Sequence, residues 1–496
     1  MPETVVQSDE VADIPWWVKR RHELGAYLTS GVLHLFLLLL MAFYILPIAR
    51  QDSAFLLIAD NKVANDPAFD PMQNFEIVSH LPEVMPSDVP QSISVPAQKI
   101  VDDPGTTLDI DLDLKELVMA AEASKFLESL PLKGEFGGRT DQGRAVMSRA
   151  FGGTAGSEHA VADGLEWLKR HQRENGSWSF NHTGKKCDET CTHPGNLGNA
   201  TVGATSMAIL CFIGAGHTHR KGAYQEQVAR GLEFILSQKE KASEKGDFRQ
   251  IVSGNSGMYT QGITAIMLCE LHGLTRDKEV GKAALDAIKF IVDAQHPRNG
   301  GWRYQPGDEQ GDTSVVGWQV MAQTSARMSR ITVSAKSRKL AEKFLDSVQL
   351  ENGAYYGYTS PGKSPSMTAV GLLCRMYQGW DKTQPAMQVG VAHLSQLGPS
   401  RDNMYYNYYA TQVMRHWGGE EWKKWNEVMR EMLVQSQDKE GHSQGSWVPR
   451  DPHGPTGGRH YMTCLAILTL EVYYRHLPIY QQQSVEQSRR GRETAP

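Results

Sequence analysis

Two cysteines and two histidines lie close together in one polar segment of the chain. They are His182, Cys187, Cys191 and His193. Thiolate sulfur and imidazole nitrogen are the usual ligands of tetrahedral zinc, so the set could hold that ion, although its spacing is not that of a common zinc module. A Cys187–Cys191 disulfide is the favoured interpretation, because the membrane topology predicted for this chain places the segment in an oxidising compartment. No cofactor is favoured, and zinc is the alternative.

The carboxylate of Asp312 directly precedes one of the most apolar stretches of the sequence. Asp312 ends the polar run 307–312, and the residues after it, which include Trp318, are nearly all apolar or small. A carboxylic acid beside a cavity can act as a general acid or base, and His460, which opens another apolar stretch, is its predicted partner. The alternative for Asp312 is a helix N-cap, because Asp is among the best capping residues.

Aromatic and polar side chains gather before two further apolar stretches. Aromatic faces on a cavity wall can hold an isoprenoid, a sugar ring or a cation, and charged groups beside them can hold an anionic substrate. Core packing and a solvated, salt-bridged loop are the alternatives. The candidate ligand-binding residues are Trp318, Tyr405, Tyr406, Tyr408, Tyr409, Trp447 and Arg459, and the polar loop around Trp447 also carries Arg450, Asp451 and His453.

The elements that must position these residues recur along the chain. Six times an amphipathic segment with apolar residues three and four apart runs into a Gln, and a second segment that is apolar all round follows. The first kind of helix has one wet face, and the second kind must be enclosed by protein. The pattern predicts an all-α fold, an α/α toroid of about six helical hairpins over 158–478, with the apolar helices inside. An open solenoid is the alternative.

Several of these turns resemble a known repeat. Residues 172–178 (QRENGSW) and 295–302 (QHPRNGGW) are similar to the Gln-x-x-x-Gly-x-Trp repeat of squalene and oxidosqualene cyclases, and 349–355 (QLENGAY) has Tyr for Trp. The resemblance extends to protein prenyltransferase β subunits and covers about 320 residues. It implies the toroid of the prenyltransferase/squalene oxidase repeat family. Gly supplies the turn, the ring packs over it, and the Gln amide can cap helix-end backbone groups.

This chain lacks some of the catalytic and zinc-binding residues of those families. In the cyclase motif the resemblance places Gly311 where the proton-donating Asp stands, and a Gly cannot protonate an alkene. In the prenyltransferases an Asp, a Cys and a His bind zinc; Asp312 and His460 match two of them, but Ser314 replaces the Cys. A hydroxyl is a poor zinc ligand beside a thiolate. The chain is therefore not expected to be a squalene-type cyclase, and whether it is an enzyme stays open.

An uncharged stretch near the N-terminus is long enough to cross a bilayer. Residues 24–48 contain no Asp, Glu, Lys or Arg. At about 1.5 Å per residue, a helix over this stretch would be longer than the ~30 Å hydrocarbon core of a bilayer. Lys19, Arg20 and Arg21 precede it and only Arg50 follows closely. The positive-inside rule predicts residues 1–23 in the cytoplasm and the bulk of this single-pass membrane protein outside it. A cleaved signal peptide is the alternative.

The remaining segments are not expected to form the core. Residues 49–157 are rich in Pro and Asp and are predicted to be a tether, with a short helix between 114 and 130 that could dock on the ring or on a partner. Residues 479–496 are predicted to be a disordered tail. The net charge of −5 and the lack of long basic runs exclude nucleic acid as an expected partner.

Three functions fit these observations. The first is a membrane-anchored extracytoplasmic toroid that binds an apolar or amphipathic ligand in its central cavity. The second is a lyase or transferase that acts on a prenyl, lipid or polysaccharide chain with Asp312 and His460 as acid or base. The third is a scaffold for protein interactions at the cell envelope. A shared fold does not choose between them.

Overall fold

The computed structural model describes residues 136–476, except 185–186, 188–190, 240–241, 243 and 250–256, and eight residues between 118 and 129. The chain divides into two compact units, Met1–Ser53 and Ala54–Pro496, and every described residue belongs to the second. The predicted span 24–48, most of the predicted tether and the tail 479–496 lie outside the described residues. No described helix has the length and apolar character that crossing a membrane requires.

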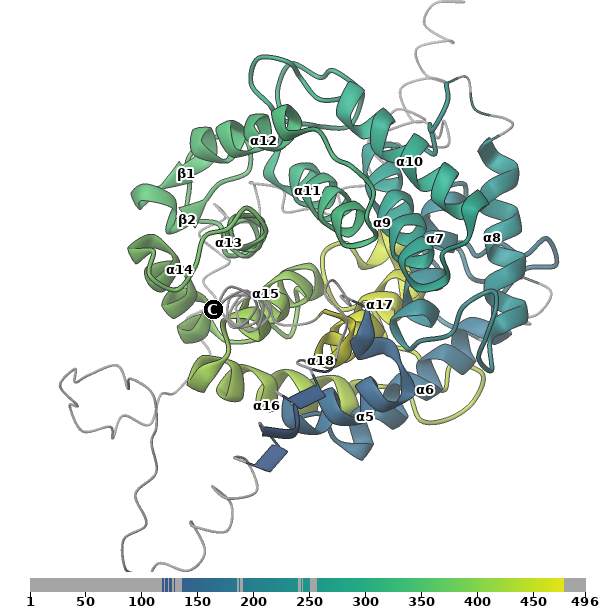
Figure 1. Ribbon diagram of the computed structural model, residues 1–496. Helices are drawn as coiled ribbons and strands as arrows, with labels where there is room; N and C mark the ends of the chain where they lie inside the picture. Colours follow the sequence, from purple (N-terminus) through teal and green to yellow (C-terminus); the bar gives the residue numbers. More distant parts are fainter. Residues whose placement is uncertain are drawn as a thin grey trace, which may run out of the picture. The chain divides into compact units, whose positions relative to one another are not determined.

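Within the described part of the chain, six helices form an outer ring and six form an inner ring (Figure 1). The outer helices are α6 (Ala155–Arg170), α8 (Gln225–Lys239), α10 (Lys278–Asp293), α12 (Ala335–Val348), α14 (Pro385–Leu397) and α16 (Gly419–Ser436). The inner helices are α7 (Thr201–Gly214), α9 (Gly257–Thr275), α11 (Thr313–Met328), α13 (Pro365–Tyr377), α15 (Met404–Trp417) and α17 (Gly454–Leu470). A two-stranded antiparallel pair, β1 (Gln349–Leu350) and β2 (Tyr355–Tyr356), flanks a 3-10 turn, η2 (Glu351–Gly353).

The two sequence patterns form the two rings. In α9 every residue from Gly257 to Leu271 is buried, whereas in α12 only five of the fourteen positions are, and they are spaced to form one face. Local chemistry sets where helices begin: Thr154 and Ser157 form a capping box at α6, and the Asp277 carboxylate accepts two backbone N–H groups at α10. The predicted division into half-wet outer and dry inner helices is confirmed.

The ring is closed. Each inner helix contacts the next one along the chain, and α17 contacts both α7 and α6, while α16 contacts α6. In Figure 1 the last hairpin therefore lies beside the first. An open solenoid would leave the first and last apolar faces uncovered, whereas closure buries both. The predicted α/α toroid is confirmed, and the solenoid alternative is wrong.

The repeated Gln is the link between neighbouring hairpins. The Gln172 side-chain N–H₂ donates to the carbonyl of Gly176 in its own turn at 2.9 Å and to the carbonyl of Gln227 on the next outer helix at 2.9 Å. The Trp178 indole N–H donates to the Leu168 carbonyl at 2.7 Å. The same arrangement recurs at Gln295, Gly300 and Trp302 and at Gln437, Gly445 and Trp447. The predicted structural role of the repeat is confirmed, and Trp447 belongs to it.

Segments before and after the ring close one of its ends. They are η1 (Gly137–Arg139), α5 (Asp141–Ala150) and α18 (Val472–Arg475). Arg139 and Arg475 reach the Glu270 carboxylate of α9 at 2.9 and 3.4 Å, and all three side chains are almost fully buried. Helical structure thus begins before residue 158, inside the stretch predicted as tether.

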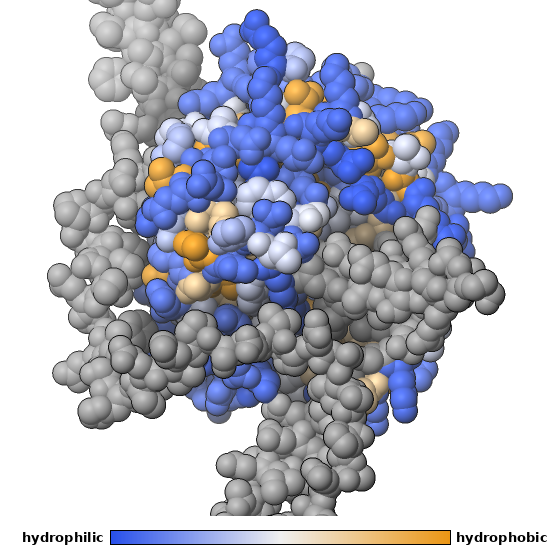
Figure 2. Space-filling model, turned by 60° about the vertical axis from the view of Figure 1, so that its left-hand side comes forward, coloured by the Kyte–Doolittle hydropathy of each residue, from blue (hydrophilic) through white to orange (hydrophobic). Residues whose placement is uncertain are grey.

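The described residues between 118 and 129 are helical, and two of them, Ala123 and Phe126, are buried in the main core. Elsewhere the surface is polar. On the face shown in Figure 2, hydrophilic side chains dominate and apolar ones form small separate patches. Among the described residues the exposed large apolar side chains are Val118, Leu350, Val389 and Val428. They are scattered over different elements, so they form no obvious docking face.

Candidate functional site at the mouth of the toroid

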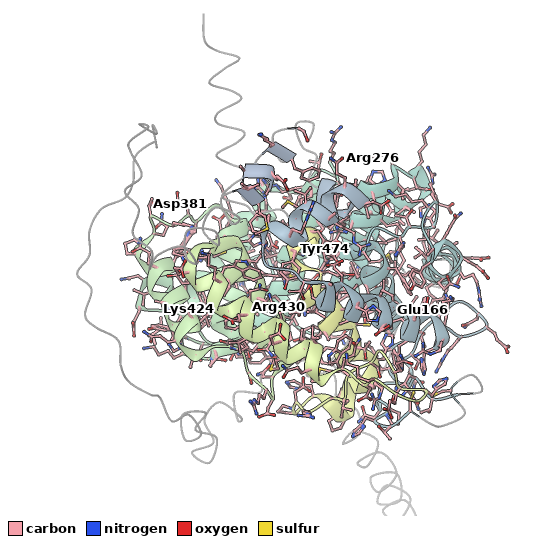
Figure 3. The ribbon with its side chains drawn as sticks, turned by 90° about the horizontal axis from the view of Figure 1, so that it is seen from below. Glu166, Arg276, Asp381, Lys424, Arg430 and Tyr474 are labelled. Atoms are coloured by element: carbon pink, nitrogen blue, oxygen red, sulfur yellow. The ribbon has the colours of Figure 1, made fainter. Side chains whose placement is uncertain are left out.

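The connections that lead from outer to inner helices all end at the N-termini of the inner helices. They therefore gather at one end of the ring, which we call the mouth. The shorter connections from inner to outer helices lie at the opposite end, where Figure 3 shows Arg276 and Asp381 along one edge. Polar residues at the mouth are the candidates for a site, because the opposite end is closed by α5, α18 and the Arg139–Glu270–Arg475 cluster.

Asp312 is fully buried at the mouth. One carboxylate oxygen, Oδ1, accepts the Val315 backbone N–H at 2.8 Å and so caps α11, as the capping alternative predicted. The other, Oδ2, has no hydrogen-bond partner within 3.5 Å among the described residues, although the Tyr358 hydroxyl lies near this carboxyl and Arg303 Nε is 3.9 Å away. Burial raises the pKa of this carboxyl to about 7, against the opposing effects of the Val315 N–H, Arg303 and the Tyr358 hydroxyl. Near neutral pH a large fraction is therefore the neutral acid.

Tyrosine hydroxyls surround this carboxyl. The Ser314 hydroxyl, two residues after Asp312, is 2.6 Å from the Tyr405 hydroxyl of α15. Because α13 separates α11 from α15 around the ring, this bond crosses the interior. Burial raises the pKa of Tyr405, and Asp312 lies within electrostatic reach of it. A second hydroxyl pair, Tyr304 and Tyr358 at 2.6 Å, faces Asp312 from the adjoining loops.

Four of the aromatic side chains predicted to bind a ligand, which we call the aromatic wall, pack against one another near Asp312, as the core-packing alternative predicted. Trp318 stacks on Tyr408 with ring centroids 5.8 Å apart and meets Tyr409 edge-on at 5.7 Å. Tyr405 lies against Tyr409 at 5.0 Å. These four rings are packed together and buried. Tyr406 is not part of the wall, because it packs between α15 and the outer helix α16 against Trp425.

A second buried carboxyl lies at the same end. Asp451 accepts the His453 backbone N–H at 3.1 Å; its Oδ2 has no hydrogen bond within 3.5 Å to a described residue, although the backbone N–H groups of Met404 and Gly454 also lie near the carboxyl. Burial raises its pKa to about 6. The buried phenol of Tyr461 is within electrostatic reach of both Asp451 and Tyr405. Two carboxyls with raised pKa values thus flank one group of tyrosines.

His460 is not brought to Asp312. Its Nε2 is 2.9 Å from the Ala204 carbonyl of α7 and 3.6 Å from the Cys464 thiol. Its ring lies against Trp167 and Phe180, near the first hairpin, and no contact among the described residues joins it to Asp312. The two side chains predicted as an acid–base pair therefore lie in different surroundings.

Arg459 joins two mouth loops and does not face the aromatic wall. Its guanidinium donates to the Thr192 carbonyl at 3.0 Å and the Thr192 hydroxyl at 2.8 Å, and forms an ion pair with Asp438. The Ser446 hydroxyl takes a further bond at 2.8 Å. The predicted ligand-binding Arg is thus occupied by the protein itself.

The predicted Cys–His set is only partly together. All six cysteines lie among the described residues, and none is in a disulfide. Cys187 and Cys191 are buried and close to each other. His182 is buried nearby, with its ring 5.7 Å from that of His171, whereas His193 is exposed and bonds to Thr192. Two other histidines, His171 and His442, face the thiols instead.

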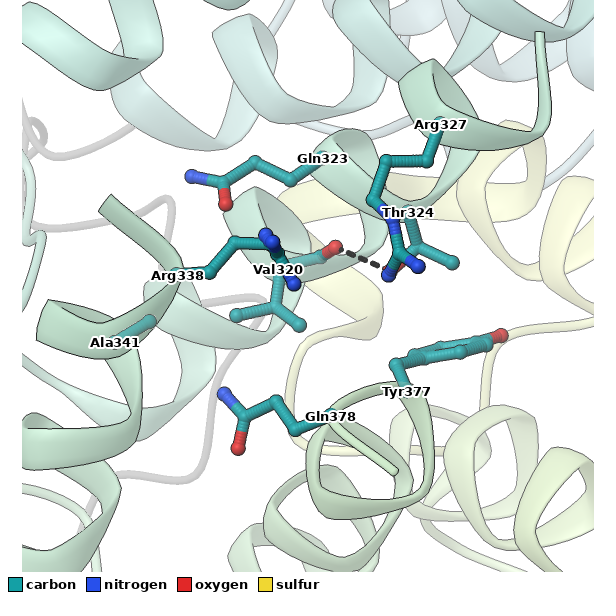
Figure 4. A pocket seen from close by; sticks show the side chains of 8 residues that line it. All are labelled: Val320, Gln323, Thr324, Arg327, Arg338, Ala341, Tyr377 and Gln378. Atoms are coloured by element: carbon teal, nitrogen blue, oxygen red, sulfur yellow. Dashed lines mark hydrogen bonds between the residues drawn. The ribbon is translucent and has the colours of Figure 1, made fainter. Parts of the chain in front are cut away.

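Several residues at the mouth were not predicted from sequence. Tyr259, Tyr304 and Tyr358 come from three separate segments and meet only around Asp312. No repeat or spacing marks them. A pocket of about 20 Å³, room for roughly one water molecule, lies elsewhere between α11, α12 and α13 (Figure 4). Its wall is Val320, Gln323, Thr324, Arg327, Arg338, Ala341, Tyr377 and Gln378.

Comparisons with known proteins give distant similarity in fold alone. No protein-family model matches the chain, and no curated protein matches it. An inactive variant of the α-1,6-mannanase GH76A of a Salegentibacter species, in complex with α-1,6-mannotriose, is 8% identical with a TM-score of 0.46, over 64% of this chain and 99% of the mannanase. A variant of the type II terpene cyclase MstE from Scytonema, with its substrate geranylgeranyl dihydroxybenzoate, is 13% identical with a TM-score of 0.43, over 64% and 97%.

Proposed function

We propose that the mouth of this toroid binds an amphipathic ligand. In this proposal the neutral Asp312 acid donates a hydrogen bond to the polar group of the ligand, and the rings of Trp318, Tyr408 and Tyr409, which are packed together in this structure, part to admit its apolar portion. The observation that carries the proposal is the buried Asp312 Oδ2, which makes no hydrogen bond within 3.5 Å to a described residue and has only the more weakly placed Tyr358 hydroxyl and Arg303 beside it. A buried polar atom without a partner costs about 1–3 kcal/mol, so an unused carboxyl oxygen calls for an explanation.

Other buried polar atoms also support a ligand site at the mouth. Trp318 Nε1, Asp451 Oδ2 and the Tyr461 hydroxyl are buried, and none has a hydrogen-bond partner among the described residues. They come from α11, the loop before α17, and α17 itself. Four such atoms on elements that meet at one end of the ring offer both donors and acceptors to a ligand. The neighbouring aromatic faces favour a ligand with a substantial apolar or ring-shaped part.

The proposal includes the location of the domain. The uncharged stretch 24–48 and the basic residues before it support a single membrane anchor with the toroid on the extracytoplasmic side. An anchored domain would meet ligands that are held in or released from the envelope. An amphipathic molecule is of that kind.

Binding is tested directly with the full-length chain purified in detergent. The protein is incubated with envelope lipid extracts and, separately, with oligosaccharide mixtures, and retained molecules are identified by mass spectrometry. We expect retention of one amphipathic class. Failure of the wild-type chain to retain any molecule from either source would overturn the proposal.

Two substitutions separate the capping role of Asp312 from its ligand role. Asp312→Asn keeps a good N-cap and places an N–H donor where the neutral acid has its O–H. Asp312→Ser also keeps an N-cap but leaves no second polar atom. We expect Asp312→Asn to bind within a few-fold of the wild type and Asp312→Ser to bind at least about ten-fold more weakly, a difference of about 1.4 kcal/mol. Equal binding by all three proteins would remove Asp312 from the site.

Acid–base catalysis is the second candidate. The pKa of about 7 at Asp312 is the observation that favours it, because a general acid works best near the pH of its surroundings. A lyase or transferase acting on a prenyl, lipid or polysaccharide chain would use Asp312 as the acid. Asp451 is a better candidate than His460 for the second acid–base residue, because Asp451 and Asp312 lie near the same tyrosines. Conversion of the retained molecule by the wild type but not by Asp312→Asn would establish this function.

A further inference from the structure

Four potential metal ligands converge where the ring closes. The ligand atoms of His171, Cys187, Cys191 and His442 all lie within 4.8 Å of one another. Cys191 Sγ is 3.5 Å from His171 Nε2 and 3.2 Å from His442 Nδ1, and Cys187 Sγ is 3.8 Å from His442 Nδ1. We call these four residues the seam cluster.

These separations fit a tetrahedral ion. Zinc–sulfur bonds of about 2.3 Å and zinc–nitrogen bonds of about 2.0–2.1 Å give a Cys₂His₂ tetrahedron edges of roughly 3.3–3.8 Å. Three sulfur–nitrogen separations, 3.2, 3.5 and 3.8 Å, lie in or next to this range, and the other ligand pairs lie within 4.8 Å, so small side-chain shifts would complete the tetrahedron. Four protein ligands would fill a tetrahedral coordination shell, and a filled shell is typical of structural zinc, because catalytic zinc keeps an open position.

The surroundings hold the first ligand in the required orientation. His171 Nδ1 is 2.7 Å from the Trp167 carbonyl, which can only accept a hydrogen. That bond places the ring proton on Nδ1 and leaves the Nε2 lone pair directed at Cys191, the arrangement usual for metal-bound histidine. The indole of Trp167 also stacks on the His171 ring at 4.0 Å, so the ring cannot easily turn away.

The four ligands come from opposite ends of the toroid sequence. His171 directly follows α6, Cys187 and Cys191 lie further along the same connection, and His442 lies in the connection between α16 and α17, more than 250 residues later. The first and last hairpins also meet through the Gln437 amide on the Ala160 carbonyl and through Arg459 on Thr192. An ion bound here would join the first hairpin to the last.

We infer that the seam cluster is a structural zinc site that locks the ring closed. Two thiolates and two neutral imidazoles would balance the charge of Zn²⁺, and the mixed sulfur and nitrogen set favours zinc over calcium or magnesium, which prefer oxygen. The site is separate from Asp312, so it can be correct whether or not the mouth binds a ligand. The predicted Cys187–Cys191 disulfide is the competing state of the same thiols.

The first experiment measures metal content. The full-length chain is expressed without a polyhistidine tag, purified in detergent, and analysed for metals by mass spectrometry. We expect about one zinc per chain. His442→Ala is the principal variant, because His442 lies in a partly exposed loop and its loss should not unfold the ring. Outer-shell substitutions alone cost about 10–100-fold in metal affinity, so loss of a direct ligand should cost at least as much.

Two matched variants complete the test. His442→Cys restores a zinc ligand at the same place and should recover the metal. His193→Ala removes an exposed histidine of the same region that lies outside the seam cluster, and it should keep the wild-type zinc content. Cobalt substitution of the wild type should give the absorption of a tetrahedral thiolate complex, and His442→Ala should not give it.

Thiol counting and a chelator separate zinc from the disulfide. In the denatured, chelated and unreduced chain, a zinc site leaves all six thiols reactive, whereas a disulfide leaves two fewer. A chelator should lower the melting temperature of the wild type and of His193→Ala but not of His442→Ala. A wild type that carries no zinc when zinc is supplied, or a His442→Ala variant that keeps it fully, would overturn the inference.

Discussion

At the scale of single residues, the buried carboxyl of Asp312 makes the free energy of unfolding depend on pH. Burial raises its pKa from an ordinary 3.8 to about 7. Between these two values the folded chain holds a proton that the unfolded chain has lost, so stability falls as pH rises through this window and is level above it. About three pKa units correspond to roughly 4 kcal/mol as an upper bound.

Asp312→Asn should abolish this dependence, because Asn caps the helix without ionising. The difference in unfolding free energy between Asp312→Asn and the wild type should therefore grow by several kcal/mol from pH 4 to pH 7.5. Denaturant unfolding at five pH values measures it, and the contributions of the other carboxyls with raised pKa values, Asp451 and Glu471, cancel in the difference. A difference that stays constant with pH would mean that the carboxyl is ionised in the folded protein.

Residue types alone revealed part of the two sites. Asp312 was identifiable because a carboxylate before an apolar helix is either a cap or an acid, and the structure shows the cap together with an unused oxygen. Cys187 and Cys191 were identifiable because they are close in sequence. His171 and His442 were not, since one ends an outer helix and the other lies more than 250 residues away from Cys187. Only ring closure brings such residues together.

At the scale of the elements, the turn after each outer helix depends on a glycine. Gly300 has φ of +80°, and a Cβ there would overlap the carbonyl oxygen of Leu340 on α12. Gly307, in the same connection, has φ of +72°, and a Cβ at this position would meet no atom within 4 Å. An alanine at either position would be strained by the positive φ, but only at Gly300 would its Cβ also overlap another backbone atom.

Gly300→Ala should therefore cost at least about 3 kcal/mol, whereas Gly307→Ala should cost only about 1 kcal/mol, the usual penalty for a left-handed non-glycine residue. Urea unfolding of both variants measures the contrast. Equal costs would show that the close approach of this turn to α12 is not a requirement of the fold.

The glutamines that end the outer helices differ in what they join. The Gln437 amide donates to Ala160 on the first outer helix and to Gly445, whereas the bonds of the Gln238 amide within the described part of the chain go to Phe234 and Ser237 of its own helix. Gln437→Ala leaves two carbonyls short of a buried partner and should cost about 2 kcal/mol, and Gln238→Ala should cost less than about 0.5 kcal/mol. Thermal unfolding of both proteins checks this, and the reverse order would contradict the role of Gln437 at the closing contact.

The helix types were predictable because their periodicity records burial directly: an inner helix such as α9 is apolar all round, and an outer helix such as α12 has one apolar face. The repeat spacing also indicated hairpins. The spacing could not show which glutamine links neighbouring hairpins, because Gln238 and Gln437 occupy similar positions in their repeats. In the second hairpin the inner-helix residue Gln261 makes the equivalent bonds to Gly246 and Ala287.

At the scale of the whole molecule, the end opposite the mouth is held by buried charge. Glu270 on α9 faces Arg139, which precedes the ring, and Arg475, which follows it. Burial alone would raise the pKa of Glu270, but the two guanidiniums lower it, so the carboxylate is ionised. Glu471 is also buried, yet its carboxylate makes no hydrogen bond among the described residues, and burial raises its pKa far above the ordinary value.

These two glutamates provide a matched test of how the ring is anchored. Glu270→Gln would remove the ionised partner of two buried guanidiniums, and breaking such a buried pair typically costs about 3–5 kcal/mol. Glu471→Gln replaces a neutral acid by a neutral amide of the same shape, so it should change stability by less than about 1 kcal/mol. Unfolding by urea at neutral pH measures both, and hydrogen exchange should show opening of α5 and α18 in Glu270→Gln only. Equal effects would mean that the segments before and after the ring are held by apolar packing and not by this ionised carboxylate.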